Sequence, residues 1–133
     1  MKFWIWHWGP AGIVMIIIFI ASATPGSDLP GFGAWDLIAK KGGHMCGYAL
    51  LASAFFHALD KKGTSARSRF IVAAGLACLY AATDEFHQRF TPGRSPSLQD
   101  VGIDALGAFI GLMVWTWISK LRRNQHPAVN SDS

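Results

Sequence analysis

Four long apolar segments constrain the fold of this chain more than any other feature of the sequence. The first runs from Ile5 to Ala23, the second from about Gly42 to Leu59, and the last from about Val101 to Leu121. The third is uninterruptedly apolar only from Phe70 to about Ala82. A membrane crossing of about 19 residues therefore also takes in the polar residues that follow it. These lengths predict an all-α integral membrane bundle of about four transmembrane helices.

Composition favours a membrane location for a single domain. Only 15% of the 133 residues are charged and 51% are apolar, whereas soluble domains carry about 25% charged residues. We expect one transmembrane domain over residues 1–123 and a polar, disordered tail over residues 124–133. Cys46 and Cys78 lie inside apolar segments without the spacing of a zinc site. We expect both to be buried and free of a disulfide.

The basic residues predict an orientation. Eight Lys and Arg residues fall on the side of the two termini and four on the other side, and these residues favour cytoplasmic flanks. We therefore expect a multi-pass protein of the bacterial inner membrane with both termini in the cytoplasm. The charge of +4 lies in short clusters rather than on one face, which gives no support for a nucleic-acid partner. The first group is Lys2, Lys61, Lys62, Arg67, Arg69, Lys120, Arg122 and Arg123, and the second is Lys40, Lys41, Arg89 and Arg94.

An alternative interpretation makes the N-terminus a cleaved signal peptide. Lys2 would form its basic region, and the small triplet at residues 21–23 would be its cleavage site. This basic region is weak, and the three early Trp residues are more typical of an interfacial belt.

Ionisable residues gather after the third apolar segment and at the start of the fourth. The stretch from Asp84 to Arg94 contains two acids, two Arg, one His and one Gln, and Asp100 and Asp104 follow it. A charge at the centre of a bilayer costs about 2.5–3.5 kcal/mol on insertion scales. Such groups need partners and are functional candidates. The predicted orientation places this polar site near the outer face of the membrane.

Three residues at the start of the second apolar segment share one helical stripe. Lys41, His44 and Tyr48 follow one another at spacings of three and four residues. Lys41 and Tyr48 are candidate ligand-binding residues, and His44 is a candidate catalytic residue. A structural interpretation stays open, in which the Lys reaches the interface, the His faces a pore and the Tyr is interfacial.

Two adjacent acids end the third segment and diverge by about 100° around its helix. Asp84 and Glu85 are candidate general acids or bases, and Gln88 is a candidate ligand-binding residue at helical spacing from both. The alternative is a set of structural salt bridges with nearby Arg or Lys. Arg94 directly follows a Pro92–Gly93 turn, which suits an Arg that binds an anion with its planar fork.

Asp100 and Asp104 are candidate ligand-binding residues at the start of the last segment. Ser97 and Asp100 have the spacing of a capping box, which gives Asp100 a structural explanation as well. Asp104 has no such explanation, although it shares a helical face with Asp100.

Glycine pairs predict how two of the helices meet. The pair Gly107–Gly111 continues the stripe of Asp104, and Gly43–Gly47 repeats the same spacing in the second segment. Such pairs let helices approach closely in a membrane. We therefore predict that the second and last helices cross tightly and bring His44 near Asp104.

Taken together, the motifs resemble the VanZ-like family of small bacterial membrane proteins. The resemblance covers about residues 41–111 and rests on separate motifs in one order. It implies a multi-span inner-membrane protein of the cell envelope, since the founding member is associated with resistance to the glycopeptide teicoplanin. The motifs are Lys41-x-x-His44-x-x-x-Tyr48, Asp84-Glu85-x-x-Gln88, Pro92-Gly93-Arg94-Ser95 and Asp100-x-x-x-Asp104-x-x-Gly107-x-x-x-Gly111.

Two positions depart from the pattern of the family. The residue before the first lysine of the motif is often Asp in the family, whereas this chain has Lys40. The family often has Asn where this chain has Asp104. The second change adds an ionisable group, so an exact carry-over of the family's mechanism to this chain is in doubt.

Three functions fit this site. The favoured one is binding of an anionic lipid headgroup, such as an isoprenoid phosphate or a lipid-linked cell-wall precursor. Lys41, His44 and Arg94 would bind the phosphate, and the acids would orient these cations or hold Mg²⁺ as a cofactor. The second function is a non-enzymatic subunit or scaffold that packs against partner transmembrane helices or a second copy. The third is an enzyme acting on a lipid-linked phosphate through His44.

Overall fold

The computed structural model describes residues 2–25, 34–95 and 97–125, and these residues form four helices and no strand. Helix α1 is Lys2–Ala23, α2 is Ala34–Ala58, α3 is Ala66–Gln88 and α4 is Leu98–Gln125. The prediction of an all-α bundle with about four helices is confirmed. Helix α4 takes in the first two residues of the predicted tail, and the remainder of that tail lies outside the described residues.

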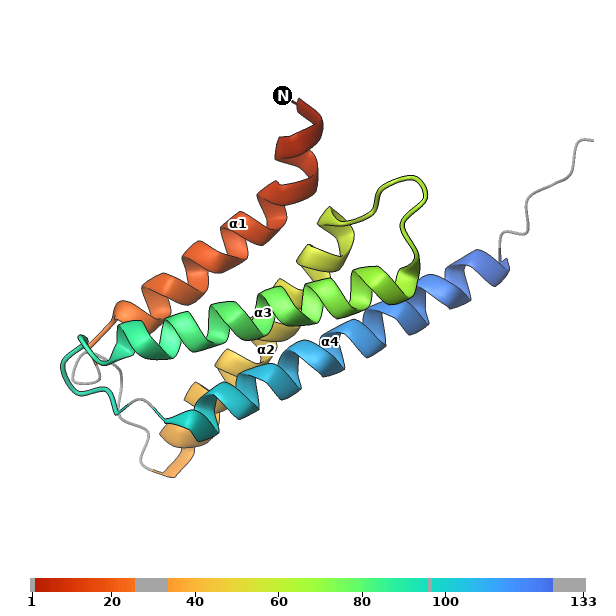
Figure 1. The fold of residues 1–133 in the computed structure, drawn as a ribbon. Coiled ribbons are helices and arrows are strands. Elements are labelled where there is room, and N and C mark those ends of the chain that lie inside the picture. The colour runs from red at the N-terminus through yellow and green to blue at the C-terminus, as the bar shows by residue number, and fades with distance from the viewer. Residues whose placement is uncertain (1, 26–33, 96, 126–133) are drawn as a thin grey trace, which may run out of the picture.

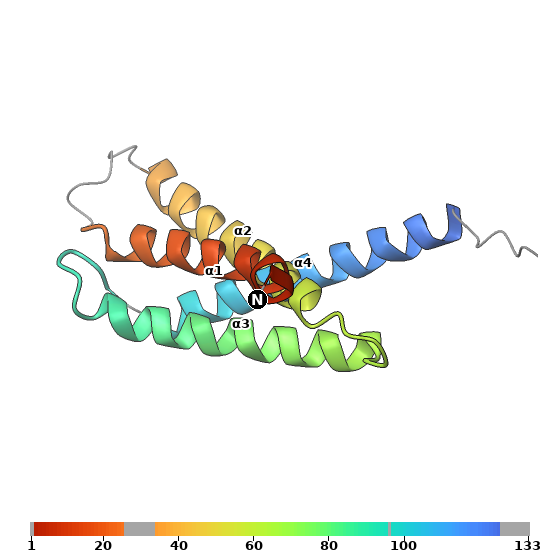
Figure 2. The ribbon, with the colours of Figure 1, turned by 90° about the horizontal axis from the view of Figure 1, so that it is seen from above.

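Successive helices run in opposite directions, so their ends gather at two places (Figures 1 and 2). The end of α1, the start of α2, the end of α3 and the start of α4 lie at one end of the bundle. The connection from α2 to α3 and the C-terminal part of α4 lie at the other. This topology collects the polar motifs of three separate segments at the first end.

Helices α2 and α4 form the closest packing in the molecule, and glycine makes it possible. A Cβ atom added at Gly107 would collide with the backbone carbonyl of Met45, and one added at Gly111 would collide with that of Ala49. The predicted close crossing of these two helices is confirmed at this pair. The partner pair behaves differently: Gly43 faces open space, and Gly47 faces the side chain of Ile18 in α1.

Helix α3 buries one continuous stripe that changes from alanine to polar residues along its length. Ala73, Ala77 and Ala81 are fully buried at successive turns. These small side chains let α3 lie close to its neighbours. The same face continues into Asp84, Glu85 and Gln88, which are 3%, 7% and 5% exposed.

A glycine turn after α3 sets the direction of the chain before α4. Gly93 has φ 73°, a left-handed conformation that other residues adopt only with strain. The amide of Arg94 donates to the carbonyl of Thr91 across this turn, at 3.2 Å. The predicted turn is therefore present, and it returns Arg94 toward the bundle.

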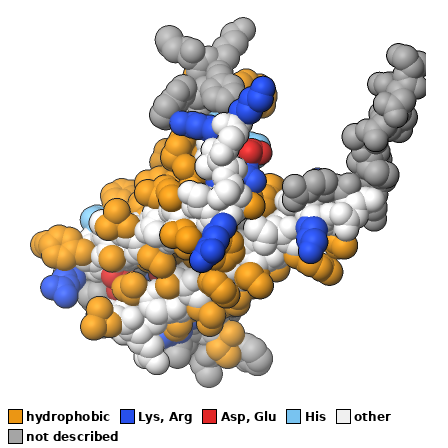
Figure 3. All heavy atoms as spheres, turned by 45° about the vertical axis from the view of Figure 1, so that its right-hand side comes forward, with side chains coloured by type: hydrophobic (Ala, Val, Ile, Leu, Met, Phe, Trp, Pro, Cys, Tyr) orange, Lys and Arg blue, Asp and Glu red, His pale blue; other side chains and the backbone are white. Residues whose placement is uncertain are grey.

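Apolar side chains cover much of the outer surface of the bundle, as Figure 3 shows for one face. They include Ile16 in α1, Leu50 in α2, Leu79 in α3 and Trp117 in α4, each at least 60% exposed. Among the described residues, two helical segments are long and apolar enough to cross a membrane, Ile5–Ala23 and Leu98–Arg122. The four membrane crossings stay a prediction.

The cysteine prediction was half right. Cys46 and Cys78 are free, as expected, but both are exposed on the outside of the bundle rather than buried in it. The sequence showed that each lies in an apolar segment but not that each points outward, where a bilayer would supply the apolar surroundings.

Candidate functional site

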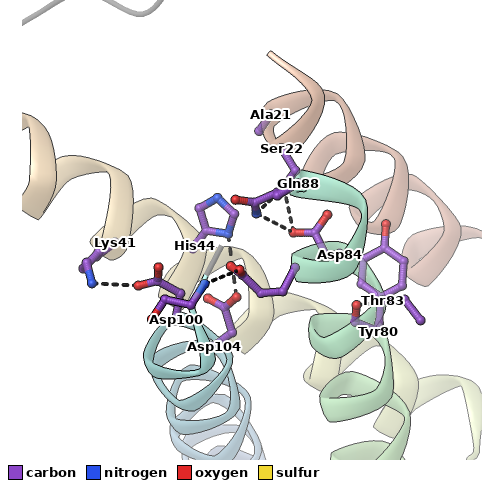
Figure 4. A network of polar contacts seen from close by, with 12 residues as sticks. Ala21, Ser22, Lys41, His44, Tyr80, Thr83, Asp84, Gln88, Asp100 and Asp104 are labelled. Carbon is purple, nitrogen blue, oxygen red and sulfur yellow. Dashed lines mark hydrogen bonds and ion pairs between the residues drawn. The ribbon is translucent and has the colours of Figure 1, made fainter. Parts of the chain in front are cut away.

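A pocket of about 250 Å³ opens at the end of the bundle where the polar motifs gather. Residues from α2, α3, α4 and the turn before α4 form its walls, and several of them appear in Figure 4. We call it the polar pocket. Its lining residues are Lys40, Lys41, His44, Glu85, Gln88, Gly93, Arg94, Ser95, Asp100, Ile103 and Asp104.

An ion pair joins α2 to α4 at the rim of the polar pocket. Lys41 Nζ lies 2.6 Å from Asp100 Oδ1, with the two side chains 34% and 30% exposed. The pair is open enough for solvent to screen it, so its contribution to stability is small. Its main effect is to hold the lysine ammonium at the pocket entrance.

Deeper in the pocket, His44 of α2 lies beside Asp104 of α4. His44 Nδ1 is 3.8 Å from Asp104 Oδ2, and Asp104 is 1% exposed. This distance is too long for a hydrogen bond, and Asp104 Oδ2 is buried without a hydrogen-bond partner among the described residues. The proximity predicted from the glycine pairs is present, because Gly107 brings the helices together one turn further along α4.

Glu85 fixes the start of α4. Its Oε2 accepts a hydrogen bond from the amide of Ser97 at 3.0 Å, while Ser97 Oγ accepts from the amide of Gln99 at 3.0 Å. Ser97 thus caps α4 as predicted. The reciprocal acceptor of the capping box is Glu85 from α3 and not Asp100, whose side chain is paired with Lys41.

Asp84 forms a buried network behind the pocket with a residue that the sequence did not indicate. Ser22 Oγ of α1 donates to Asp84 Oδ2 at 2.7 Å, and Gln88 Nε2 donates to the same oxygen at 3.3 Å. Ser22 is fully buried. The two adjacent acids of α3 therefore diverge as predicted, Asp84 toward α1 and Glu85 toward α4.

Arg94 connects the turn before α4 to the end of α1. Its Nη2 donates to the carbonyl of Ala21 at 2.7 Å, and its Nε donates to that of Thr24 at 3.3 Å. The last carbonyls of a helix lack partners within the helix and carry partial negative charge, so a cation is favourable there. Arg94 also lines the polar pocket.

Two of the predicted site residues do not line the pocket. Tyr48 is fully buried in the core, and its hydroxyl has no hydrogen-bond partner among the described residues. Asp84 contacts Ser22 and Gln88 instead. The pocket does bring together Lys41, His44, Glu85, Gln88, Arg94, Asp100 and Asp104.

The structure adds pocket residues that sequence reasoning did not select. Lys40 entered the sequence argument through the charge distribution and as a departure from the family pattern, and Ile103 lies in an apolar segment, but both line the pocket. Ser22 carried no signal, because it is a small residue in a uniformly apolar helix. Within residues 2–25, 34–95 and 97–125, no three His, Cys, Asp or Glu side chains are placed to hold a metal ion. Mg²⁺ binding stays a prediction.

Fold and pocket together define a small helical-bundle protein with a polar pocket at one end and an apolar outer surface. The chain matches the family model described as VanZ/LLP1 over residues 7–119, so it belongs to the VanZ/LLP1 family, as the motifs indicated. No curated protein and no solved structure matches the chain.

Proposed function

We propose that this protein binds the phosphate-bearing headgroup of an anionic lipid or isoprenoid phosphate in the polar pocket. The protein lies in the bacterial inner membrane with both termini in the cytoplasm, and the pocket faces the outer leaflet. Apolar side chains on the outside of all four helices support the membrane location. The excess of Lys and Arg on the side of the termini supports the orientation.

The observation that carries the proposal is the group of three cations in the wall of a small pocket: Lys40, Lys41 and Arg94. A volume of about 250 Å³ is below the roughly 300–1,000 Å³ of sites that enclose drug-sized ligands. It suits a headgroup whose apolar chain stays in the bilayer. Lys40 adds a charge where the family often has Asp.

Lys41 and Arg94 keep unused donors for such a ligand. Lys41 gives one hydrogen bond to Asp100, and an ammonium has further N–H groups. Arg94 gives one to the carbonyl of Ala21 in α1 and one to that of Thr24 just after it, and a guanidinium has more N–H groups than these two acceptors use. Both side chains are thus held in position while part of each faces the pocket.

The carboxylates give the pocket a second kind of recognition. Asp104 Oδ2 has no hydrogen-bond partner among the described residues, and Glu85 uses one oxygen for Ser97. Carboxylate oxygens accept hydrogen bonds from hydroxyl or amino groups. A headgroup with a phosphate and a sugar or amine next to it would use both sets, as a lipid-linked cell-wall precursor does.

Two substitutions at the rim of the polar pocket test the proposal, because they should change ligand binding in opposite directions. Lys41→Gln removes an ammonium, so we expect binding of a long-chain isoprenoid phosphate to weaken about tenfold. Asp100→Asn removes the carboxylate that competes for that ammonium, so we expect binding to tighten. Native mass spectrometry of the detergent-released protein measures both, with the isoprenoid alcohol as the ligand that lacks phosphate. Equal binding of the alcohol and the phosphate would overturn the proposal.

The same variants test a role in glycopeptide susceptibility. If the pocket holds an envelope lipid, cells that express the wild type should differ in teicoplanin susceptibility from cells that express Lys41→Gln at equal protein abundance. A change caused by lower abundance alone would favour the scaffold interpretation. The Gly107–Gly111 pair is used inside the molecule, which leaves this glycine face unavailable to a partner helix.

A second candidate function is catalysis, and the placement of His44 favours it. His44 lines the pocket and faces the buried Asp104, an arrangement in which an acid can orient a histidine that transfers a proton. If the protein is an enzyme, the Asp104→Asn variant should bind the isoprenoid phosphate as the wild type does but lose turnover. If the protein only binds the lipid, neither the wild type nor the variant should release inorganic phosphate.

A further inference from the structure

We propose a second lipid site at the opposite end of the bundle, which binds the phosphodiester of an anionic phospholipid. This site is separate from the polar pocket and rests on the membrane location and orientation proposed above, not on the headgroup specificity of that pocket. The proposed orientation puts it at the cytoplasmic leaflet.

The site is a pocket of about 600 Å³ where α2, α3 and α4 meet. We call it the distal pocket. Its lining residues come from the end of α2, the start of α3 and residues 115–120 of α4; Figure 1 shows the connection from α2 to α3 at this end of the bundle. The residues used below are Phe56, His57, Asp60, Arg69, Trp115 and Lys120, all of which line it.

Arg69 is the main anion-binding group of the distal pocket. Its guanidinium lies 4.5 Å from the centre of the Phe56 ring, and its Nη1 is 2.5 Å from Asp60 Oδ1. The side chain is 16% exposed, and its Nε is buried without a hydrogen-bond partner among the described residues. Phe56 and Asp60 therefore hold the guanidinium in place in the wall of the pocket, and a guanidinium has more N–H groups than the one contact with Asp60 uses.

The charges around Arg69 favour an anion. Lys120 lines the pocket from α4, and His57 lines it from α2. Asp60 is the single acid among the described lining residues, and its side chain is 62% exposed. Lys61, Lys62, Arg67 and Arg122 are exposed around the same end of the bundle.

The apolar surface beside the distal pocket identifies a lipid as the source of the phosphate. Ile71 of α3 and Trp117 and Leu121 of α4 are exposed within a few residues of the lining side chains. Trp115 lines the pocket and is 42% exposed, and Trp is typical of the membrane interface. Basic pockets between helices on the cytoplasmic side are the common sites for anionic headgroups.

Lys120 and Lys62 provide a matched test. Both are exposed lysines at the same end of the bundle, but only Lys120 lines the distal pocket. Each substitution by Gln removes one positive charge. Native mass spectrometry of the detergent-released full chain, titrated with phosphatidylglycerol, should show about fivefold weaker binding at this site for Lys120→Gln. Lys62→Gln should bind nearly as the wild type does.

Three further arms of the titration decide the outcome. Arg69→Gln should weaken binding more than Lys120→Gln, and because Lys120→Gln removes no packing, it keeps the test valid if Arg69→Gln does not fold. Phosphatidylcholine should bind weakly, and inorganic phosphate at equal concentration should not displace the lipid. Equal effects of Lys120→Gln and Lys62→Gln, or equal binding of the two lipids, would overturn the proposal.

The two proposals fail separately. Lys41→Gln changes the polar pocket and leaves the distal pocket intact, so it should weaken binding of the isoprenoid phosphate and leave binding of phosphatidylglycerol unchanged. Lys120→Gln should do the reverse. If the wild type bound the isoprenoid phosphate no better than the isoprenoid alcohol but still bound phosphatidylglycerol through Lys120, the polar-pocket proposal would be refuted and this one would stand.

Discussion

The two ends of the bundle handle charge in opposite ways. At the polar-pocket end, the acids of α3 and α4 are buried, with Asp84, Glu85 and Asp104 at 3%, 7% and 1% exposure. At the distal end the lysines of the α2–α3 connection are exposed, and Asp60 is 62% exposed on its side chain. The buried acids at the polar-pocket end are therefore stabilised by partners within the protein. The exposed charges at the distal end are stabilised by solvent and remain accessible to a partner outside the protein.

This difference has a consequence for specificity. A buried carboxylate must be satisfied by groups at fixed positions, so the polar-pocket end can recognise only a ligand that completes that arrangement. Exposed cations interact through a screened field that many anions satisfy. We expect a narrow choice of ligand at the polar pocket and a broad choice among anionic lipids at the distal pocket.

The largest effect on stability should come from the glycine contact that joins α2 to α4. Gly107→Ala places a methyl group against the backbone carbonyl of Met45, and overpacking of this kind costs about 1–3 kcal/mol or more. Gly102→Ala on the same helix points into open space and should leave stability unchanged or slightly higher. Thermal unfolding in detergent compares the two. Equal midpoints would show that α2 and α4 do not pack this closely.

A pair of acid substitutions tests the contrast between the ends directly. Asp84→Ala leaves the buried Ser22 hydroxyl and the Gln88 amide without their acceptor, which should cost about 1–3 kcal/mol of stability. Asp60→Ala removes an acid that is 62% exposed but leaves the Arg69 guanidinium with only the Phe56 ring, so it should cost less stability than Asp84→Ala. Denaturant unfolding of both variants in the same detergent measures the difference. Similar losses would mean that the two ends are not distinct.

The smallest effect should come from the capping of α4. Ser97→Ala removes the hydroxyl that accepts from the amide of Gln99, a loss of about 1 kcal/mol for a typical cap. Glu85→Ala should cost a similar amount, because it removes the acceptor of the Ser97 amide. Asp100→Ala should leave the cap intact. Hydrogen exchange of the amides in the first turn of α4 measures the effect of all three substitutions. Faster exchange in Asp100→Ala would support the capping box of Ser97 and Asp100 that the sequence predicted.

Much of the fold followed from features that act locally along the chain. Apolar length predicted the helices, and the Gly107–Gly111 spacing predicted the crossing of α2 and α4 because close approach depends on residue size alone. The positions of His44 and Asp104 followed from that crossing. The turn at Gly93 was predictable because few residues adopt a positive φ.

The parts that the sequence did not reveal depend on which helices become neighbours. Ser22 contacts Asp84 only because α1 packs beside the end of α3. Glu85 replaced Asp100 in the cap of α4 because a neighbouring helix supplied a better-placed acceptor. Tyr48 shares a helical stripe with Lys41 and His44, yet it lies one turn further into the bundle, where it is fully buried beside Tyr80 of α3 and does not line the polar pocket.

The contacts of Arg94 also bear on the order in which the chain assembles. Helix α1 precedes the other three helices in the chain, but its polar partners come much later. Arg94 follows Ala21 by 73 residues, and Asp84 follows Ser22 by 62 residues. Contacts so distant in sequence cannot form until the intervening chain has left the ribosome. Helix α1 can pack against α2 earlier, as at Gly47 and Ile18, but its contacts with Asp84 and Arg94 form only after α3 and the turn that follows it have been made, so this part of the polar-pocket end assembles late.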